Sequence, residues 1–322
     1  MDTTIKLIPG TANFLEDILT GLKARPKFLH SKYFYDRQGD AIFQQIMAMK
    51  EYYLTDSEMD ILANQSKEIA KMIAEKNSPF DLLELGAGDA TKSIHLLKEL
   101  TALELEFSYL PVDISANVIT NLENCLPLQL PGLDIKGLNG DYLDMLKKGT
   151  TFSDRRKVVL FMGANIGNMN MEDTLNFCNK LRESLSENDI LLIGFDLKKN
   201  PRQILSAYSD AGGITRDFNL NLLKRINREL GGDFDLKNFE HYASYDPESG
   251  ACKSFLVSLT DQTVHIGDDT IQFLENEYIF MEISQKYALE DIEMLAIKSG
   301  FRCKQHFFDK NMYFVDSIWL VD

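Results

Sequence analysis

The sequence has few cysteines, and none of them forms a pattern that binds metal or defines a disulfide framework. The four cysteines of this 322-residue chain lie far apart, with no Cys-x-x-Cys pair and no histidine at ligand spacing: Cys125, Cys178, Cys252 and Cys303. Disulfide-rich proteins and zinc sites concentrate their cysteines. The sequence therefore predicts no disulfide framework and no metal site, and it favours a reducing compartment.

Positive charge and long apolar runs are also scarce. The 34 Lys and Arg residues are outnumbered by 49 Asp and Glu residues, which gives a net charge of -15, and the basic residues form no cluster. Phosphate-binding proteins gather basic residues on one face, and anionic membranes attract the same residues. No apolar run approaches the length that spans a bilayer, and Met1–Lys6 lacks the pattern of a signal peptide. We expect a cytoplasmic monomer that binds a small molecule and neither nucleic acid nor membrane.

What the sequence does contain is a regular alternation of apolar and amphipathic segments. A composition of 44% hydrophobic and 26% charged residues can bury a sizeable core. Amphipathic stretches near 12–24, 39–50 and 56–76 predict helices. Alternation of strands with helices is typical of βαβ units and of a parallel sheet covered on both faces. From Phe80 onward it predicts five such strands, at 81–86, 107–113, 133–138, 157–163 and 189–195.

The alternation stops after Asp196. Three strand-like runs follow at 253–259, 262–267 and 277–284, and then a helix at 289–299 with Gly300 at its C-cap position. Two alternating runs, 301–308 and 312–321, are joined by a short turn and predict a β-hairpin. The sequence thus predicts an α/β fold, with a seven-stranded Rossmann-like core and an inserted α+β domain. We place the inserted, substrate-binding domain at 1–60 plus 197–286, and the core at 61–196 plus 287–322.

The segment 81–92 carries the strongest functional pattern. An apolar strand ends with Glu84, a Gly-x-Gly turn follows at Gly86 and Gly88, and a helix begins after it. Glycines let the backbone approach a ligand closely, and ligands of open α/β sheets bind at the carboxyl ends of the strands. A dinucleotide fingerprint requires a third glycine where Thr91 stands. S-Adenosylmethionine has no pyrophosphate, and Glu84 suits its ammonium group.

Two further acids follow the next strands. Asp113 ends the second strand, where a carboxylate can accept both ribose hydroxyls, and Asp141 follows the third, next to Tyr142, where it can accept the adenine amino group. Three acids at successive strand ends favour the sulfonium cofactor. A dinucleotide fold, or an α/β protein whose turn acids are incidental, stays open as an alternative on these residues alone.

Several other motifs carry a resemblance to a known family. They are Tyr33-Phe34-Tyr35-Asp36, Glu51-Tyr52-Tyr53, Gly163-Ala164-Asn165-Ile166-Gly167-Asn168, Ala207-Tyr208-x-Asp-Ala, Asn227-Arg228-Glu229-Leu230 and Glu282-Ile283-Ser284. With the Glu-Leu-Gly-x-Gly loop, and from about Ser31 to the C-terminus, the chain resembles the histidine Nα-methyltransferases of ergothioneine biosynthesis. The resemblance implies a class I methyltransferase core that uses S-adenosylmethionine to trimethylate the α-amino group of L-histidine, giving hercynine.

The resemblance also implies roles for individual residues. Those expected at the cofactor are Glu84, Gly86, Gly88, Lys92, Asp113, Asp141 and Tyr142. Those expected at the substrate are Tyr35 and Asn168 at the reacting amine, Gly163 beside it, Tyr52 and Tyr208 at the carboxylate, and Glu282 and Ser284 at the imidazole. A buried carboxylate that accepts an imidazole N–H contributes about 1.5–3 kcal/mol, and tyrosine faces suit a quaternary ammonium product.

Other roles are open for several of these residues. Tyr52 and Tyr208 also fit packing aromatics, Asn168 fits a helix N-cap, and Glu282 fits a solvated strand face. The chain departs from the family at Ser254, where the resemblance places a methionine against the imidazole ring. Three alternatives to histidine Nα-methylation therefore stand: methylation of another amino acid, methylation of a histidine ring nitrogen, and a catalytically inactive cofactor-binding protein.

Overall fold

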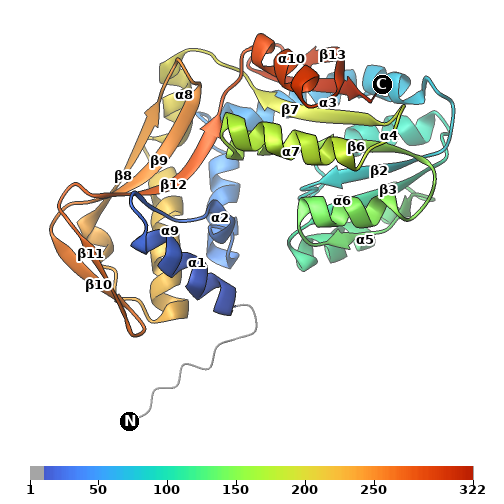
Figure 1. Cartoon of the computed structure of the whole chain (residues 1–322). Helices are drawn as coiled ribbons and strands as arrows, with labels where there is room; N and C mark the ends of the chain where they lie inside the picture. Colours follow the sequence, from blue (N-terminus) through green and yellow to red (C-terminus); the bar gives the residue numbers. More distant parts are fainter. Residues whose placement is uncertain (1–10, 322) are drawn as a thin grey trace. The chain divides into compact units, whose positions relative to one another are not determined.

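The computed structural model describes residues 11–321, and the N-terminal segment Met1–Lys6 discussed above lies outside that range (Figure 1). The chain divides into two compact units. Unit 1 comprises Met1–Tyr53 and Lys199–Ser284, and unit 2 comprises Leu54–Lys198 and Gln285–Asp322. Residues 54–60, which the sequence analysis assigns to the inserted domain, lie in unit 2, because helix α3 runs without a break from Tyr53 to Ala74.

Unit 2 alternates strands with helices over most of its length. Its helices are α3 (Tyr53–Ala74), α4 (Ser93–Ala102), α5 (Ala116–Gln129), α6 (Tyr142–Thr150), η2 (Asn165–Asn168), α7 (Met171–Glu183) and α10 (Leu289–Lys298). Its strands are β2 (Phe80–Leu85), β3 (Phe107–Asp113), β4 (Asp134–Ile135), β5 (Leu138–Asn139), β6 (Arg156–Phe161), β7 (Ile190–Asp196), β13 (Arg302–Phe308) and β14 (Phe314–Leu320).

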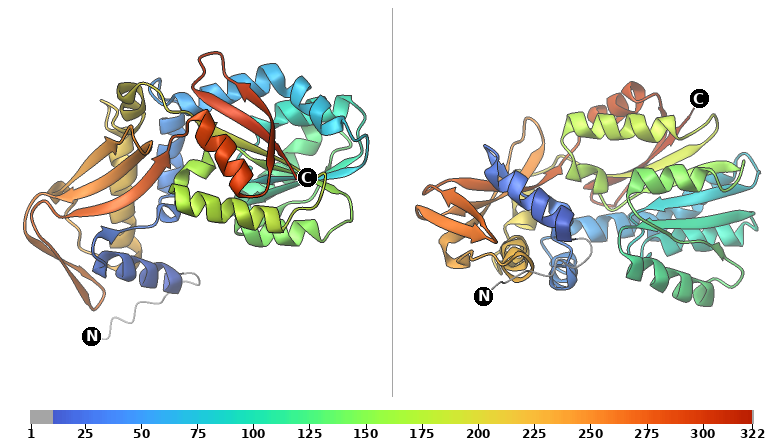
Figure 2. Two further views of the ribbon diagram at one scale, coloured as in Figure 1. Left: turned by 45° about the horizontal axis from the view of Figure 1, so that its top comes forward. Right: turned by 60° about the horizontal axis from the view of Figure 1, so that its bottom comes forward.

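These strands form one sheet in the order β13-β14-β7-β6-β2-β3-β4, and β5 also pairs with β3. The strands from β4 to β7 are parallel, whereas β14 runs antiparallel to both β7 and β13. Figure 2 shows this C-terminal hairpin in red from two further sides. Since β4 and β5 occupy one position beside β3, the sheet has the seven strand positions of a class I methyltransferase core. The predicted fold class is confirmed.

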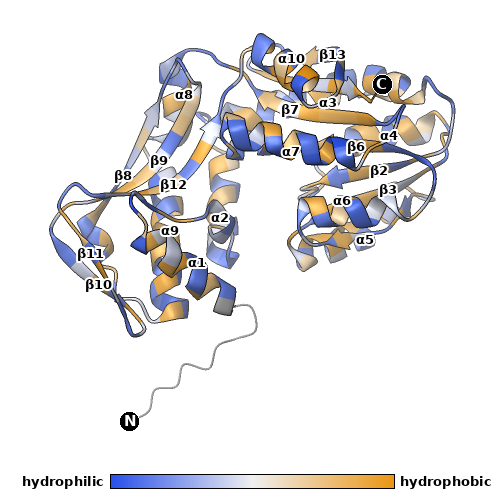
Figure 3. Ribbon diagram, in the orientation of Figure 1, coloured by the Kyte–Doolittle hydropathy of each residue, from blue (hydrophilic) through white to orange (hydrophobic). Residues whose placement is uncertain are grey.

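Helices cover both faces of the sheet because the central strands are buried along their whole length. One face packs against α6, α7 and α10 in a single hydrophobic core that includes Leu83, Phe161, Ile193 and Trp319. Figure 3 shows β7 coloured hydrophobic along most of its length. The side chain of Glu84 on β2 points to the other face of the sheet. Gly194 of β7 also faces that side, where it lies against Glu58 of α3.

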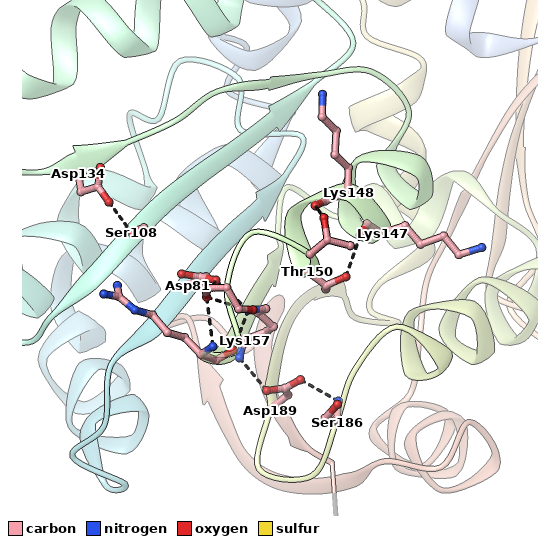
Figure 4. A network of polar contacts seen from close by, with 12 residues as sticks. Asp81, Ser108, Asp134, Lys147, Lys148, Thr150, Lys157, Ser186 and Asp189 are labelled. Atoms are coloured by element: carbon pink, nitrogen blue, oxygen red, sulfur yellow. Dashed lines mark hydrogen bonds and ion pairs between the residues drawn. The ribbon is translucent and has the colours of Figure 1, made fainter.

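A polar network closes the amino ends of the strands, away from the ends that carry the candidate site (Figure 4). Lys157 is buried and donates from Nζ to Asp81 Oδ2 at 2.8 Å, and its backbone N donates to Asp189 Oδ1 at 2.7 Å. The second oxygen of Asp189 accepts from Ser186 N at 2.8 Å. Each buried charge thus has partners, which is the condition for keeping it inside a protein.

Unit 1 contains helices, a four-stranded sheet and a hairpin. Its helices are α1 (Thr11–Lys23), η1 (Ser31–Tyr33), α2 (Arg37–Met47), α8 (Pro201–Tyr208), α9 (Ile214–Leu230) and η3 (Leu236–Asn238). The sheet has the order β1-β12-β9-β8, from β1 (Lys27–Phe28), β12 (Tyr278–Gln285), β9 (Ala251–Ser258) and β8 (Phe239–Tyr245), and the hairpin joins β10 (Gln262–Ile266) to β11 (Asp269–Phe273). A second hydrophobic core, with Phe34, Phe218, Leu256 and Met281, lies within this unit.

The structure corrects the predicted elements at a few places. The strand predicted at 133–138 is two short strands, β4 and β5, which pair with β3 in the same register. The ladder is interrupted at Gly137, whose backbone N donates to Glu123 Oε1 of α5 at 2.8 Å. Strands β8 and β11 and the long helix α9 are not predicted. The helices at the N-terminus, the helix closed by Gly300 and the C-terminal hairpin are confirmed. Within residues 11–321, no helix is both long and apolar enough to cross a membrane.

Candidate active site

The Gly-x-Gly turn of unit 2 has a backbone that only glycine adopts easily. Gly86 and Gly88 have φ angles of 79° and 55°, and a Cβ atom at Gly88 would meet nothing within 4 Å. Gly86 N donates to Val112 O at 2.8 Å, which fixes the turn at the end of β3. The turn therefore leaves open space beside its backbone at the carboxyl edge of the sheet.

Asp113 lies at the same edge and orders the turn. Its Oδ2 accepts from Gly88 N at 3.2 Å, and its Oδ1 accepts from Ser115 N at 2.9 Å. Asn139 supports the segment by donating to the backbone oxygen of Asp113 at 3.0 Å. The side chain is only partly buried. A carboxylate fixed in this way keeps lone pairs for the two hydroxyls of a ribose.

Glu84 lies one strand away and is almost fully buried, with 4% of its surface exposed. Tyr109 donates its hydroxyl to Glu84 Oε2 at 2.5 Å. Burial raises the pKa of Glu84 to about 7, although hydrogen bonds from Tyr109 and Ser93 oppose the rise. A cation placed beside this carboxyl would favour its charged form. The ammonium group of an amino acid is such a cation.

Asp141 and Tyr142 follow β5. Asp141 is exposed and caps helix α6 by accepting from Leu143 N at 3.0 Å. The Tyr142 hydroxyl approaches to 3.0 Å from where a Cβ of Gly86 would lie, so Tyr142 packs against the glycine turn. Burial, together with the charges of Asp113 and Asp141, raises the pKa of Tyr142 to about 12. These contacts bring Tyr142 to the predicted cofactor residues.

Lys92 and Gly163 meet at a residue that the sequence analysis missed. Glu58 of α3 forms an ion pair with Lys92 Nζ, and its other oxygen accepts from Gly163 N at 2.6 Å. Burial alone would lower the pKa of Lys92, but the charge of Glu58 and the hydrogen bond to it raise that pKa above its ordinary value. The one signal in the sequence was an acid on the apolar stripe of an amphipathic helix, between Leu54 and Leu62.

Asn168 ends the turn that begins at Gly163. Gly163 has a φ of 76° and Ala164 one of 54°, and the side chain of Asn165 holds the turn by donating to Met162 O at 2.8 Å. Asn168 is exposed, and it does not cap the following helix, since Asn170 is the N-cap of α7. The structure thus removes the capping alternative for Asn168.

The aromatic residues predicted at the substrate lie together in unit 1. The ring of Tyr35 packs edge-on against Phe43 and Phe218, with centroid distances of 5.5 and 5.7 Å. Phe43 in turn contacts Tyr52, whose ring lies 6.3 Å from that of Tyr208. Tyr35 is nevertheless 46% exposed. An aromatic row with polar tips results, and it fits both packing and cation binding.

Tyr208 links this row to strand β12. Its hydroxyl and Ser284 Oγ are 2.7 Å apart, so the structure joins two of the predicted substrate residues. Glu282 precedes Ser284 on the same strand. The strict alternation of buried residues along β12 ends after Met281, because Glu282, Ile283 and Ser284 are all half-buried. Glu282 therefore does not lie on a fully solvated strand face.

Ser254 lies on β9, the neighbour of β12 in the sheet, and is 1% exposed. It pairs with Ala243 of β8 and shares its strand face with buried Cys252 and Leu256. Phe255, on the opposite face, contacts Phe280 of β12 with a centroid distance of 5.9 Å. Phe280 shares its face of β12 with Glu282 and Ser284, so Ser254 lies on the face of the sheet opposite those two residues. The structure therefore does not bring Ser254 together with the two residues predicted at the imidazole.

Acids from two motifs of the resemblance stabilise the beginnings of helices. Asp36 caps α2 by accepting from Gly39 N at 2.7 Å, and it also forms an ion pair with Arg228 of α9 at 2.6 Å. Asp210 accepts from Ile214 N and Thr215 N, both at 2.9 Å, and so starts α9. These acids begin α2 and α9, the helices that follow Tyr35 and Tyr208 along the chain. Among the described residues, no group of three His, Cys, Asp or Glu side chains is arranged to hold a metal ion.

The residues of unit 2 fit S-adenosylmethionine by their chemistry. The open glycine turn, the partly exposed Asp113 and the buried Glu84 are a donor and acceptor set for ribose and ammonium groups. With the strand order of the sheet, they define a class I S-adenosylmethionine-dependent methyltransferase. A model of the histidine-specific, S-adenosylmethionine-dependent methyltransferases matches residues 14–321, and the chain belongs to this family.

Individual relatives agree with this assignment. The histidine N-alpha-methyltransferase of Mycolicibacterium smegmatis is 34% identical over 288 residues, which is 89% of this chain and 88% of the relative. The enzyme of the same name from Mycobacterium tuberculosis is 33% identical over 273 residues, 84% of this chain and 83% of the relative. Among solved structures, magnesium protoporphyrin IX methyltransferase from Synechocystis is similar with a TM-score of 0.45 and 11% identity, covering 91% of this chain and 98% of its own.

Proposed function

We propose that this enzyme methylates the α-amino group of free L-histidine three times and forms hercynine. The observation that carries the proposal is the Tyr208–Ser284 hydrogen bond, because it orders a hydroxyl two residues from the carboxylate of Glu282 on one strand, in the family that the chain belongs to. An imidazole offers one N–H donor and one N acceptor, which a carboxylate and a hydroxyl can satisfy. The partner is a small molecule, and we propose a cytoplasmic monomer. The net charge of -15 disfavours a nucleic-acid partner, and the scattered cysteines fit a reducing compartment.

Residues of the chain have distinct tasks in the proposed reaction. S-Adenosylmethionine, when bound, supplies a methyl group that its sulfonium already activates. Lys92, Asp113 and Glu84 hold the cofactor in place, and Gly163 and Asn168 orient the amine. Alignment of reactants alone can contribute up to about 7–11 kcal/mol. The amine loses its proton before each transfer, and that proton passes to water, either directly or through a tyrosine hydroxyl such as that of Tyr35, which gives up its own proton as it takes one. The third transfer leaves no lone pair and ends the series.

The test is a mass-spectrometric assay of the purified protein with S-adenosylmethionine and each standard amino acid in parallel. We expect histidine alone to gain up to three methyl groups, and fragment ions to place all of them on the α-nitrogen. A single methyl on the ring, or modification of a different amino acid, would contradict the proposal. Binding of the cofactor without any turnover would show an inactive protein.

Glu282→Gln tests the ring recognition directly. The substitution removes the charge from a bond to the imidazole, so kcat/KM for histidine should fall about 10–100-fold, the equivalent of about 1.5–3 kcal/mol. Glu240→Gln is the matched control, because Glu240 is an exposed residue on β8 of the same sheet. Steady-state kinetics on both variants decide the point. An equal kcat/KM for the parent and Glu282→Gln would remove Glu282 from the site.

A further inference from the structure

Glu58 is a charged residue on the buried side of a helix. It lies in α3, where its neighbours on the same stripe are Leu54, Ile61 and Leu62, and none of its surface is exposed. A carboxylate in such a position destabilises the folded state unless partners compensate it. Its partners therefore show what keeps it there.

The two oxygens of Glu58 bind two different segments of unit 2. Oε1 accepts from the backbone N of Gly163 at 2.6 Å, at the start of the turn that leads to Asn168. Oε2 forms an ion pair with Nζ of Lys92, the residue that precedes α4. One side chain thus ties the turn after β6 to the beginning of α4.

Strand β7 makes room for this arrangement. A Cβ atom at Gly194 would lie 2.4 Å from Glu58 Oε1 and 3.0 Å from Asp316 Oδ1, so the carboxylate occupies the space of the missing side chain. Asp316 is fully buried, and its oxygens have no hydrogen-bond partner among the described residues. Burial raises the pKa of Asp316 well above its ordinary value, and the charge of Glu58 adds to that rise. Of these two acids, Glu58 is the one that forms the ion pair with Lys92.

We propose that Glu58 is a positioning residue that holds Lys92 at the cofactor and Gly163 at the reacting amine in one fixed geometry. The proposal rests on the proposed function, because that function gives Lys92 and the turn from Gly163 to Asn168 their tasks. Glu58 acts only through these two partners. A loss of its charge should act on the cofactor through Lys92, and a loss of its acceptor oxygen should act on histidine through Gly163.

The lysine contact is tested by a double-mutant cycle on binding of S-adenosylhomocysteine, measured by calorimetry. The variants are Glu58→Gln, Lys92→Met and both together. We expect Glu58→Gln to change the affinity at least fivefold in the parent and less than twofold once Lys92 is removed, because the effect passes through the lysine. Asp316→Asn is the matched control, an isosteric change of a neighbouring buried acid whose oxygens have no hydrogen-bond partner among the described residues, and its effect should be the same in both backgrounds. Additive effects of Glu58→Gln and Lys92→Met would overturn the proposal.

The glycine contact is tested by comparing Glu58→Gln with Glu58→Met. The amide of glutamine can still accept from Gly163 N, whereas methionine cannot, so only Glu58→Met should raise the KM for histidine, by about tenfold or more. If Glu58→Met does not fold, Gly194→Ala is a second test, since its methyl group displaces the Glu58 carboxylate without changing that side chain. An unchanged KM in Glu58→Met, or in Gly194→Ala, contradicts the proposed role of Gly163.

The two proposals fail in different ways. The cycle needs only S-adenosylhomocysteine and is read without any amino acid, so a parent enzyme that methylates another amino acid would overturn the proposed function and leave the lysine test valid. A parent that methylates histidine while the cycle is additive would overturn the role of Glu58 alone.

Discussion

We expect the protonation state of the Glu84 side chain to change when a ligand binds. The carboxyl is buried on the face of β2 that lies opposite α6 and α7, and burial raises its pKa from 4.5 to about 7. Near pH 7, then, about half of the ligand-free enzyme carries a proton on this group. A cofactor ammonium beside Glu84 would favour the charged form and expel that proton.

We predict that S-adenosylhomocysteine releases about three-quarters of a proton per molecule when it binds at pH 6.5, and that its affinity rises between pH 6 and pH 8. The reason is that only charged Glu84 pairs with the ammonium group, while the ligand-free enzyme has a pKa of about 7 there. Calorimetry in two buffers of different ionisation enthalpy measures the release. Glu84→Gln should release none, whereas exposed Glu187→Gln should behave as the parent. Equal heats in both buffers would exclude this role for Glu84.

The same pKa determines the sign of a stability effect in the ligand-free enzyme. Because the folded pKa of Glu84 lies above its ordinary value of 4.5, the folded state binds more protons than the unfolded state between those two values. The stabilisation from this group is present below pH 4.5 and is lost as the pH rises through about 7. A bound ammonium group would reverse that loss.

Among the elements of unit 1, α2 and α9 depend on one acid. Asp36 accepts from Gly39 N at the start of α2, from Asn221 Nδ2 at 2.9 Å and from Arg228, so it caps one helix and holds the other. Burial works to raise the pKa of Asp36, but these hydrogen bonds lower it below its ordinary value. The ring of Tyr35 packs against Phe43 of α2 and Phe218 of α9.

Asp36→Ala should lower the free energy of unfolding by about 1–3 kcal/mol, because it removes a helix N-cap and the bonds to α9. Urea titration followed by circular dichroism measures the change. The affinity for S-adenosylhomocysteine should be unaltered, since the predicted cofactor residues belong to unit 2. Asp269→Ala is the control: it removes an exposed ion pair with Lys23, and we expect less than about 0.5 kcal/mol. A similar loss in both variants would refute the special role of Asp36.

The same elements show how far the sequence predicts the fold. The strands of unit 2 were predictable because their apolar runs are buried on both faces, as in β2 and β7. Helix α9 was not, because Thr215, Asn219 and Asn221 occupy buried positions and hide its apolar period. Strand β8 was missed for a related reason, since most of its residues are partly exposed and polar.

The residues of the candidate site also divide into those that the sequence reveals and those that it does not. Acids at strand ends, such as Glu84 and Asp113, are visible in the sequence because a strand, a turn and an acid are neighbours along the chain. The importance of Glu58 and Asp316 cannot be read from the sequence, because it comes from Lys92, Gly163 and Gly194, which tertiary packing brings to them. The roles given to Tyr52, Ser254 and Glu282 stay predictions.

Over the whole molecule, each unit has its own hydrophobic core, and the single tryptophan lies in only one of them. Trp319 is fully buried in unit 2, where its ring packs against Phe195 and Phe301. Its fluorescence therefore reports the unfolding of the unit that holds the predicted cofactor residues. A ligand that binds only the folded state stabilises it by RT ln(1 + [L]/Kd).

We predict that S-adenosylhomocysteine at about one hundred times its Kd stabilises unit 2 by about 2.7 kcal/mol and raises the Trp319 thermal transition by about 5–10 °C. The ligand binds residues that only the folded sheet edge brings together, so it binds the folded state and not the unfolded one. Asp113→Ala removes the proposed acceptor of the ribose hydroxyls, so at the same ligand concentration most of this shift should disappear. Fluorescence-detected melting of the parent and the variant, each with and without ligand, makes the comparison. A Trp319 transition that does not move with the ligand would mean that the cofactor does not bind the unit to which we assign it.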